Sequence, residues 1–486
     1  MVPEDFIKPS IKALIIESNV LKKDRPLHKL AYVGTPCQIQ ALRKAQLFDF
    51  QKVKQEWPRR VRFSISLFCT ESFPYNNIIK LIEEYGVNLS EVKKWDIKGK
   101  LIAYTDKDKF ETPLKKAKKF ARENCQLCLD YTGELGDIST GAVGSELGWN
   151  TVIVRTPTGL NIVEGAIKEG YLKAEEIDIT SKGISLLRKL SRKKFKSAWK
   201  SKSKKEKEAK VPHLDTIHEV DMDRLLKLTT VEHKIDELTR DIIEPGLCVT
   251  CGACEASCAE GIIKIDGEGK PYKTKDCEST DCGRCYATCP RTTLPIDLIE
   301  EKLFGSKRYI FEKRILGQFI KIYTAKAGEM VKSENTQDGG ATSAILMYAL
   351  DKGIIDASIS IAKGEKPWYP IPYISVNSEG LRESAGTIYS SAPTITALKR
   401  ALIQHEEYGK YLSFLIKMGF LPEIAIAEEE TTKQKEGGGI EETDLEEVIK
   451  RKEKFEGAIV RLSNPKVKML IEKGDVKKAV ETIIGE

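Results

Sequence analysis

Eight of the twelve cysteines in this chain lie in two dense groups between residues 248 and 289. Their spacings are C-x2-C-x2-C-x3-C and C-x4-C-x2-C-x3-C-P, close to the paired motifs of bacterial ferredoxins. In such a pair, three thiolates on one tight loop bind one [4Fe-4S] cluster, and the fourth thiolate binds the neighbouring cluster. The pattern predicts one cluster on Cys248, Cys251, Cys254 and Cys289, and a second on Cys277, Cys282, Cys285 and Cys258.

Two details depart from the usual ferredoxin motif. The first group is followed by Ala259 instead of proline, and the second group opens with four intervening residues instead of two. Neither change removes a ligand. A zinc site is the alternative, but structural zinc sites prefer well-separated Cys-x2-Cys pairs, often with histidine. The order of these eight cysteines therefore favours iron–sulfur clusters.

The other four cysteines are Cys37, Cys69, Cys125 and Cys128. Cys37 follows a Gly-Thr-Pro turn after an apolar run, Cys69 ends another apolar run, and the last two form a Cys-x2-Cys pair in a loop. A third cluster is one interpretation of this spacing. Buried cysteines also fill cores as small apolar residues, and a lone Cys-x2-Cys pair can be redox-active or bind zinc.

The segments around these four cysteines predict a mixture of strands and helices. Residues 30–36 and 62–69 are short, β-branched apolar runs that indicate buried strands. Residues 149–163 indicate a hairpin with Pro-Thr-Gly at its turn. Helical periodicity occurs in residues 10–23 and 77–86. We therefore expect an α/β piece in this part of the chain.

A second α/β piece follows the cysteine-dense segment. Residues 319–328 and 354–363 indicate strands, and residues 341–353 indicate a helix between them. The fold class is thus α/β (α+β) in two pieces, with a bacterial-type 2[4Fe-4S] ferredoxin module inserted. The predicted order is an α/β piece over 1–185, a charged helical linker over 186–240, the ferredoxin module over 241–300, a second α/β piece over 301–403, and a linker with a helical tail over 404–486.

The excess of basic over acidic residues is concentrated in one region of the chain. There are 79 basic and 72 acidic residues, for a net charge of +7, and much of the excess lies between Arg188 and Lys210. A solvated helix end is the favoured interpretation, and a patch for nucleic acid or anionic lipid is the alternative. No stretch has the apolar length of a transmembrane helix, and the first residues do not resemble a secretory signal. We expect a cytoplasmic protein, in which patterned cysteines bind metal.

Three stretches match motifs of a known family: VGTPCQIQAL, SLFCTESF and CQLCLDYTGELGDISTGAVGSELGWNTVIVRT. They resemble the coenzyme F420 hydrogenase/dehydrogenase beta-subunit family over roughly residues 27–185. In that family, the cysteines of these motifs bind a [4Fe-4S] cluster beside a flavin. The resemblance therefore implies that Cys37, Cys69, Cys125 and Cys128 bind a third cluster.

Residues 241–403 resemble the N-terminal part of the same family, including TQDGGATSAILMYALDKGIIDASISI and AGTIYSSAPTITALKRAL. In the family this half comes first, so the order is reversed here. Residues Pro9–Leu14 also resemble Pro393–Leu398, and family members carry one such helix where the two halves join. The chain is interpreted as a circular permutation with the join duplicated, or as two tandem copies that each lost a half. The halves could pair within one chain or between chains.

The resemblance also implies that the chain binds FAD. Gly339 and Gly340 open a predicted helix, whose free N–H groups attract a phosphate, although a diglycine turn is also common in plain loops. A second polar, glycine-rich loop lies in the family signature. The implied flavin contacts are Gly339, Gly340, Thr342, Ser343, Asp137, Ser139, Thr140, Gly141, Gly144 and Ser145.

The implied function is an iron–sulfur flavoprotein subunit that exchanges a hydride between coenzyme F420 and FAD and passes electrons through its clusters. Its partner would be a catalytic subunit of the hydrogenase, formate dehydrogenase or heterodisulfide reductase type, and no nucleic acid is expected. No catalytic side chain is assigned, because this chemistry needs no acid or base and the five histidines lie outside the motifs. The alternative is an electron-wiring subunit without flavin.

Overall fold

The computed structural model describes residues 27, 29–47, 57–97, 99–207, 234–278, 282–308, 313–331 and 338–401. The chain divides into two compact units, residues 1–409 and 410–486, and all described residues belong to the first unit. The helix predicted over 10–23, the first copy of the repeated hexapeptide and the predicted tail lie outside the described residues.

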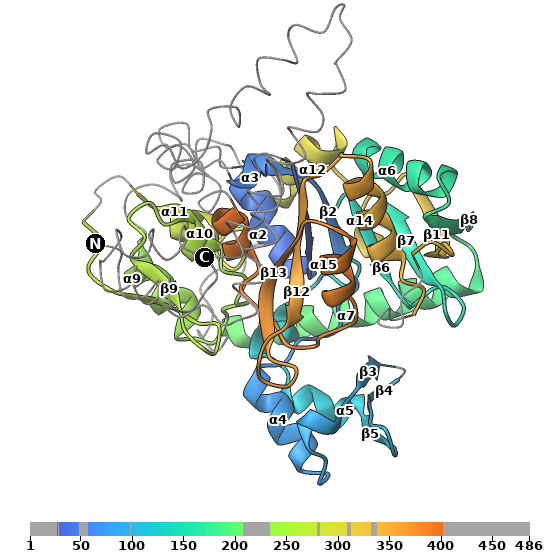
Figure 1. The fold of residues 1–486 in the computed structure, drawn as a ribbon. Helices are drawn as coiled ribbons and strands as arrows, with labels where there is room; N and C mark the ends of the chain where they lie inside the picture. Colours follow the sequence, from blue (N-terminus) through green and yellow to red (C-terminus); the bar gives the residue numbers. More distant parts are fainter. Residues whose placement is uncertain are drawn as a thin grey trace, which may run out of the picture. The chain divides into compact units, whose positions relative to one another are not determined.

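An eight-stranded mixed sheet lies at the centre of the described fold (Figure 1). Its strands are β1 Leu30–Gly34, β2 Val61–Leu67, β6 Ile138–Gly141, β7 Asn150–Val154, β8 Leu172–Glu176, β11 Lys321–Ala327, β12 Ala357–Lys363 and β13 Pro370–Ser375. They are arranged in the order β13-β12-β1-β2-β6-β7-β11-β8. β12, β1, β2 and β6 are parallel neighbours, and the other pairs are antiparallel.

The parallel strands form because their sequences can be buried on both faces. All five residues of β1, Leu-Ala-Tyr-Val-Gly, are buried. Parallel strands that are covered on both faces have near-continuous apolar or small residues instead of an alternating pattern. The strands predicted over 30–36, 62–69, 319–328 and 354–363 are confirmed as β1, β2, β11 and β12.

Strands from both α/β pieces build this one sheet. β11, β12 and β13 come from the later piece, and the other five strands come from the earlier piece. β12 pairs with β1 in parallel, with Leu30 opposite Ala357. β11 lies between β7 and β8, with Tyr323 opposite Val152 on one side and Glu176 on the other. The two halves therefore pair within one chain.

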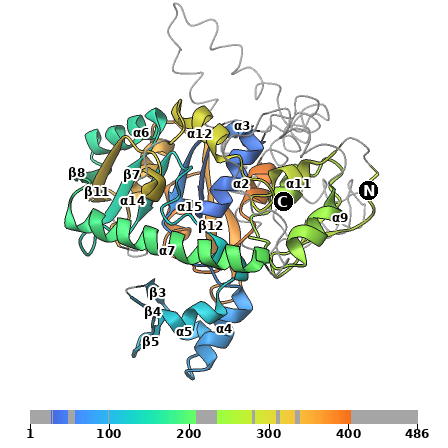
Figure 2. The ribbon, with the colours of Figure 1, turned by 180° about the vertical axis from the view of Figure 1, so that it is seen from behind.

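Helices cover both faces of the sheet (Figures 1 and 2). One face packs against α6 Pro157–Lys168, α14 Ala341–Asp351 and α15 Ser378–Glu383. The other face packs against α2 Pro36–Leu47, α7 Lys182–Lys207 and α12 Ile296–Phe304. α14 confirms the helix predicted over 341–353. The described fold is mixed α/β, as predicted, and strands of both pieces form one large sheet.

The hairpin predicted over 149–163 is wrong. Residues 150–154 form β7, and the chain then enters α6 at Pro157. The Thr156 hydroxyl caps this helix, since it accepts a hydrogen bond of 3.1 Å from Gly159 N. Threonine at the N-cap followed by proline at the first helical position favours a helix start. This signal outweighs the turn preference of Pro-Thr-Gly.

A smaller antiparallel sheet packs with α4 Tyr75–Glu83, which confirms the helix predicted over 77–86. The strands of this sheet are β3 Lys94–Ile97, β4 Lys100–Tyr104 and β5 Lys109–Pro113. Trp368 from the later piece contacts Trp95 edge to face, with ring centroids 6.1 Å apart. Its Nε1 also donates a hydrogen bond of 2.8 Å to Val92 O. The later piece therefore helps to bury this sheet too.

The cysteine-dense segment forms short helices and one hairpin. Its elements are α9 Ile235–Leu238, α10 Ala253–Ser257, β9 Ile263–Ile265, β10 Pro271–Lys273 and α11 Arg284–Thr288. α10 and α11 pack against each other and against α2. The remaining short helices are α3 Trp57–Arg60, α5 Leu114–Ala117, α13 Lys313–Leu316, η2 Leu89–Glu91, η3 Lys118–Phe120, η4 Glu123–Leu127 and the π-helical turn η5 Thr239–Ile243.

Candidate metal centres

Cys37, Cys69, Cys125 and Cys128 gather at the carboxyl ends of two neighbouring strands. Cys37 is the second residue of α2, just after β1, and Cys69 follows β2. β1 and β2 are adjacent and parallel, and the carboxyl ends of parallel strands meet at one edge of a sheet. Cys125 and Cys128 lie in and directly after η4. Ser72 N, just beyond β2, donates a hydrogen bond of 3.4 Å to Cys125 Sγ. These four cysteines are called the edge set.

Burial and neighbouring thiols both shift the pKa values of the edge set. Burial raises the pKa of Cys69, Lys194 opposes this rise, and Cys125, Cys37 and Cys128 add to it. Burial likewise raises the pKa of Cys125 to about 11, with contributions from Cys37 and Cys128. Negative charge on one of these thiols therefore disfavours negative charge on the others.

Three basic side chains lie next to the edge set. Lys194 of α7 donates a hydrogen bond of 2.6 Å from Nζ to Cys69 O. Burial lowers the pKa of Lys194, but the neighbouring thiols outweigh burial and raise it. Arg291 and Arg122 bring guanidinium groups to the same cysteines. The Nε atom of each arginine is buried without a hydrogen-bond partner among the described residues. Unfilled donors and positive charge suit a bound anionic cluster.

A second group consists of Cys248, Cys251, Cys254 and Cys289, which line one largely apolar cavity. We call it the inner set. Burial raises the pKa of Cys251, and Cys289 makes the next largest contribution. The cysteine from the second sequence motif thus lies beside the three from the first. Thr250 N also donates a hydrogen bond of 3.4 Å to Cys248 Sγ, the kind of contact that tunes cluster sulfurs.

The remaining group, the outer set, consists of Cys258, Cys277, Cys282 and Cys285. Burial raises the pKa of Cys285, and the other three thiols raise it further. Lys399 donates a hydrogen bond of 2.9 Å from Nζ to Cys258 O. This grouping agrees with the predicted exchange of one cysteine between the two ferredoxin motifs, and the exchange stays a prediction.

Packing places the inner set between the other two: Cys251 belongs to one core cluster with Cys37, and Cys254 belongs to another with Cys258 and Cys285. Burial and neighbouring inner-set thiols raise the pKa of Cys254, and Cys285 of the outer set contributes as well. On the other side, burial raises the pKa of Cys248 and Cys251, and Cys37 of the edge set is among the further causes. Three neighbouring redox centres would allow single electrons to pass from one to the next.

The inner set rests on the second copy of the repeated hexapeptide. Ile395 N donates a hydrogen bond of 3.1 Å to Cys251 O. Gly252 has a φ of +82°, and a Cβ at this position would lie 2.9 Å from Pro393 O. Glycine is required here because it accepts the left-handed backbone and leaves room for the close approach. The segment Pro393–Leu398, the second copy of the hexapeptide, therefore helps to position the first ferredoxin motif.

The geometry of the cysteines differs from that of a single-ion site. Among the described residues, no group of three or more His, Cys, Asp or Glu side chains is placed to hold one metal ion. A [4Fe-4S] cluster takes one thiolate on each of its four irons, so its ligands are spaced more widely. Four thiols per set, with nearby cations and backbone donors, fit such a cluster. The assignment of individual ligands stays a prediction.

Two residues implied as flavin contacts already have partners within the core. Asp137 forms a buried ion pair of 2.7 Å with Arg43 and accepts a hydrogen bond of 2.7 Å from Ser64 N. Ser139 Oγ accepts a hydrogen bond of 2.7 Å from Arg155 Nε. These contacts join β2, β6 and the helices around them. The side chains of Asp137 and Ser139 therefore have a structural role in the fold.

The other implied residues of this loop lie near the edge set. Thr140 is buried in β6, and its Oγ1 has no hydrogen-bond partner among the described residues. Gly141 ends β6, Gly144 has a φ of +110°, and Ser145 Oγ lies 2.8 Å from Thr151 Oγ1. Because β6 runs parallel to β2, the loop after β6 lies at the sheet edge that carries the edge set.

The Gly339-Gly340 turn precedes α14, as its sequence predicts. Gly340 is the N-cap of the helix with a φ of +68°. Asn150 Oδ1, from the earlier piece, accepts a hydrogen bond of 3.1 Å from Ala341 N. One N–H group at the helix start is therefore already used, while the side chains of Thr342 and Ser343 are half-buried. All the flavin contacts stay predictions.

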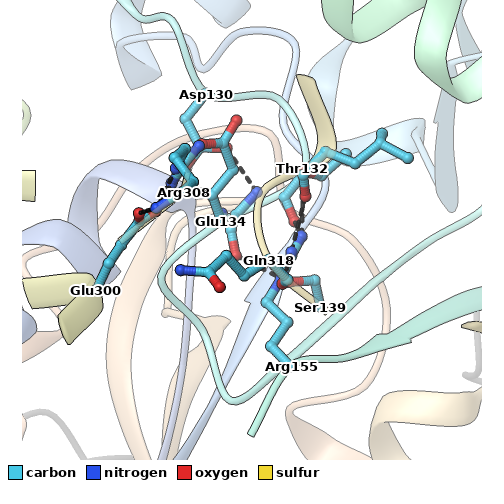
Figure 3. A network of polar contacts seen from close by, with 10 residues as sticks. Asp130, Thr132, Glu134, Ser139, Arg155, Glu300, Arg308 and Gln318 are labelled. Atoms are coloured by element: carbon cyan, nitrogen blue, oxygen red, sulfur yellow. Dashed lines mark hydrogen bonds and ion pairs between the residues drawn. The ribbon is translucent and has the colours of Figure 1, made fainter. Parts of the chain in front are cut away.

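A buried charge network joins the two pieces of the chain (Figure 3). Arg308 forms ion pairs with Glu134 and Glu300. Burial raises the pKa of Glu134 to about 7, although Arg308 opposes the rise. Arg155 donates a hydrogen bond of 2.7 Å from Nη1 to Leu316 O. The sequence did not reveal this network, because Arg308 and Glu134 lie 174 residues apart and no local pattern marks them.

Two family models match the chain. The model for the C terminus of the coenzyme F420 hydrogenase/dehydrogenase beta subunit matches residues 27–180. The model for the N-terminal part of the same subunit matches residues 322–399. The match to the C-terminal part thus comes first in this chain, in agreement with the reversed order expected from the sequence.

Several curated proteins are similar to parts of the chain. The coenzyme F420 hydrogenase subunit beta of Methanosarcina barkeri is 40% identical over 36% of this chain and 60% of its own length. The same subunit of Methanococcus voltae is 36% identical over 42% of this chain and 72% of its own length. The coenzyme F420-dependent sulfite reductase of Methanocaldococcus jannaschii is 36% identical over 40% of this chain and 32% of its own length. The chain spans about three fifths of the Methanosarcina barkeri subunit.

One solved structure is also similar, the F420-reducing [NiFe] hydrogenase complex from Methanosarcina barkeri. A chain of that complex is 38% identical, with a TM-score of 0.35, over 37% of this chain and 62% of the other. In a separate finding, none of the helices in the described part of the chain is long and apolar enough to cross a membrane.

Proposed function

The chain belongs to the coenzyme F420 hydrogenase/dehydrogenase beta-subunit family, and on that basis we propose that it is an F420-linked electron-transfer subunit of an oxidoreductase. In this proposal the chain binds FAD and three [4Fe-4S] clusters and works in the cytoplasm with a catalytic partner. The partner is of the hydrogenase, formate dehydrogenase or heterodisulfide reductase type. Relatives are named as F420-dependent hydrogenase, sulfite reductase and formate dehydrogenase proteins.

The observation that carries the proposal is the series of three cysteine sets. Bound FAD would exchange a hydride with coenzyme F420, and bound clusters would carry single electrons. In this proposal the centres would follow the order of the cysteine sets, with the inner set between the other two. Lys194 and Arg291 place positive charge at the edge set, where negative charge accumulates on reduction.

The placement of the flavin beside the edge set is supported by the loop after β6. This loop and both strand-end cysteines, Cys37 and Cys69, lie at the same sheet edge. Parallel α/β sheets bind their ligands at this edge, outside the carboxyl ends of the strands. The turn at Gly339 and Gly340 is a second candidate contact, because helix starts attract phosphate groups.

A second candidate function is an electron-wiring subunit that has clusters but no flavin. Two observations favour it. Asp137 is fully engaged with Arg43 and Ser64. Asn150 occupies an N–H group at the start of α14 that a phosphate could use. In this case electrons would enter and leave the cluster series through partner proteins.

Anaerobic purification of the full-length chain distinguishes these functions. We expect about twelve irons and one FAD per chain, with absorbance from both clusters and flavin. Adding reduced coenzyme F420 should bleach the flavin absorbance. Iron without FAD would contradict the first function and support the second. Bound FAD that reduced F420 does not bleach would show that another donor supplies the electrons.

A further inference from the structure

Helix α7 runs along one side of the described fold (Figure 2) and has two different faces. Residues three, four or seven positions apart share one face of a helix. With this spacing, one face is buried against the core and consists of Ile184, Leu187, Ser191 and Ala198. The opposite face has exposed lysines with the same spacing: Lys182, Lys189, Lys193, Lys196 and Lys200. We call these five lysines the basic face.

The positive charge of the basic face has no counterpart on its own helix. The sequence of α7 has no acidic residue between Lys182 and Lys204. On another helix end, by contrast, the exposed Lys352 lies 3.0 Å from the carboxylate of Glu169. Lysines four positions apart repel each other and destabilise a helix, so the basic face does not serve stability. Such a field attracts an acidic partner and accelerates its association.

Two aromatic rings adjoin the basic face. Phe195 and Trp199 stack with ring centroids 6.1 Å apart and an angle of 10° between the rings. Trp199 is 53% exposed, and Lys202 Nζ lies 5.7 Å from the centroid of its ring. Tryptophan is enriched among the residues that dominate the binding energy of protein interfaces. An exposed tryptophan next to five lysines therefore favours a protein docking surface over a plainly solvated helix.

The inner side of the same helix contacts the edge set. Lys194 Nζ donates a hydrogen bond of 2.6 Å to Cys69 O, and α7 packs against η4, which contains Cys125. An α-helix with its side chains is about 10–12 Å across. A protein bound to the basic face is therefore separated from the edge set by little more than one helix. This position favours a protein that carries electrons over nucleic acid or a lipid surface.

We propose that the basic face of α7 is the docking surface for an acidic electron-carrier protein that exchanges single electrons with the edge-set cluster. In each exchange the reduced carrier loses one electron and the oxidised cluster gains it, and no bond forms or breaks. The inference rests on the proposed function, because it requires a cluster in the edge set. It goes beyond that function by giving the cluster series an electron donor other than FAD.

The test measures how fast a reduced plant-type [2Fe-2S] ferredoxin, an acidic carrier, reduces the anaerobically purified full-length chain. Stopped-flow absorbance gives the second-order rate constant. Freeze-quenched samples are examined by electron paramagnetic resonance, in which the signal that is missing in Cys37→Ser identifies the edge-set cluster. The charge-reversal variant combines Lys189→Glu, Lys193→Glu and Lys196→Glu. At low to moderate salt we expect its rate constant to fall at least about tenfold, because steering by opposite charge accelerates association by about 10- to 1000-fold.

Salt and a matched control variant show whether the effect belongs to the basic face. At about 1 M salt, where the Debye length is about 3 Å, the charge-reversal variant and the wild type should react at similar rates. The control combines three reversals on the elements that cover the opposite face of the sheet: Lys168→Glu, Lys352→Glu and Arg382→Glu. It changes the net charge equally and should react within about twofold of the wild type at about 0.1 M salt, where the Debye length is about 10 Å.

The outcomes separate this inference from the proposed function. A wild-type chain that shows no edge-set signal with dithionite contradicts the proposed function itself. With that signal present, no reduction by the ferredoxin, or equal rates in the wild type and the charge-reversal variant, overturns only the docking surface. Equal slowing in the control also overturns it, because net charge alone would then explain the effect.

Two further measurements close the remaining alternatives. If the charge-reversal variant loses iron, the variant with glutamine at the same three positions decides: a slower reaction at full iron content supports the docking surface, and a wild-type rate overturns it. Binding to duplex DNA and to anionic vesicles is measured in parallel. Loss of such binding in the charge-reversal variant, with an unchanged rate for ferredoxin, would assign the basic face to another class of partner and overturn the inference.

Discussion

A buried thiol is a poor place for negative charge unless a cation lies next to it. At Cys37, burial raises the pKa, Arg291 opposes the rise, and Cys128 adds to it. Iron replaces the proton on each sulfur, so deprotonation of the thiols and metal binding occur together. The four thiols of the edge set would therefore act as one binding unit for the proposed cluster, and removal of one ligand would weaken the binding of the whole cluster.

Cys37→Ser tests this unit directly. We expect the iron content of the anaerobically purified chain to fall by about four atoms, with the ferredoxin pair retained. Iron analysis and visible absorbance measure the loss. Cys277→Ser is the matched control, because it should also remove about four irons but from the outer set. Full iron content in Cys37→Ser would mean that the edge set holds no cluster.

At the scale of elements, Arg308 ties α12 to the loop that leads into β6. Its partners are Glu300 on α12 and Glu134 in the loop. The two segments come from different halves of the chain, and a buried ion pair of this kind is costly to break because the remaining charge is left uncompensated. The network thus sets how firmly the halves are joined on this face of the sheet.

Replacing Arg308 with methionine should therefore destabilise the chain strongly. Arg308→Met leaves two buried carboxylates without their partner, and we expect a loss of about 3–5 kcal/mol. Urea unfolding of the anaerobically purified protein measures the change. Lys321→Met is the control, because it removes a partly exposed ion pair of 3.0 Å with Glu164 and should cost no more than about 1 kcal/mol. Equal effects of the two variants would show that the network does not join the halves.

The sequence predicted several central elements but not their pairing. Apolar runs identified β1, β2, β11 and β12, and periodicity identified α4 and α14. The contact between Leu30 and Ala357 joins strands from distant parts of the chain, and no local pattern encodes such a register. At the site, cysteine spacing predicted the two ferredoxin motifs. The contact between Lys194 and Cys69 could not be predicted in this way, because only the fold brings these distant residues together. For Arg291 the sequence does contain a local signal of its position near the cysteines, because this residue comes two positions after Cys289.

At the scale of the whole chain, the reversed order of the two halves does not prevent one sheet from forming. β12 and β13 extend the sheet beyond β1, and β11 fills the position between β7 and β8. The halves interact through strand pairing, through buried ion pairs and through the contact of the ferredoxin helices with α2. These contacts should keep the halves together even when the backbone between them is cut.

A protease site inserted between α7 and α9 tests this expectation. After cleavage of the folded, full-length protein, we expect both fragments to elute together in gel filtration and to keep their iron. Separation in urea is the control that shows cleavage to be complete. Fragments that separate in native buffer would contradict a sheet shared within one chain.

The position of β11 also has a consequence for biosynthesis. β8 pairs only with β11 in the sheet, and β11 occupies one side of β7. The ribosome makes β8 well before β11, because the whole cysteine-dense segment lies between them in the chain. Until β11 emerges, the nascent chain therefore exposes unpaired strand edges, which promote aggregation. Slow translation at low temperature, together with added chaperones, should raise the yield of folded protein in a recombinant host.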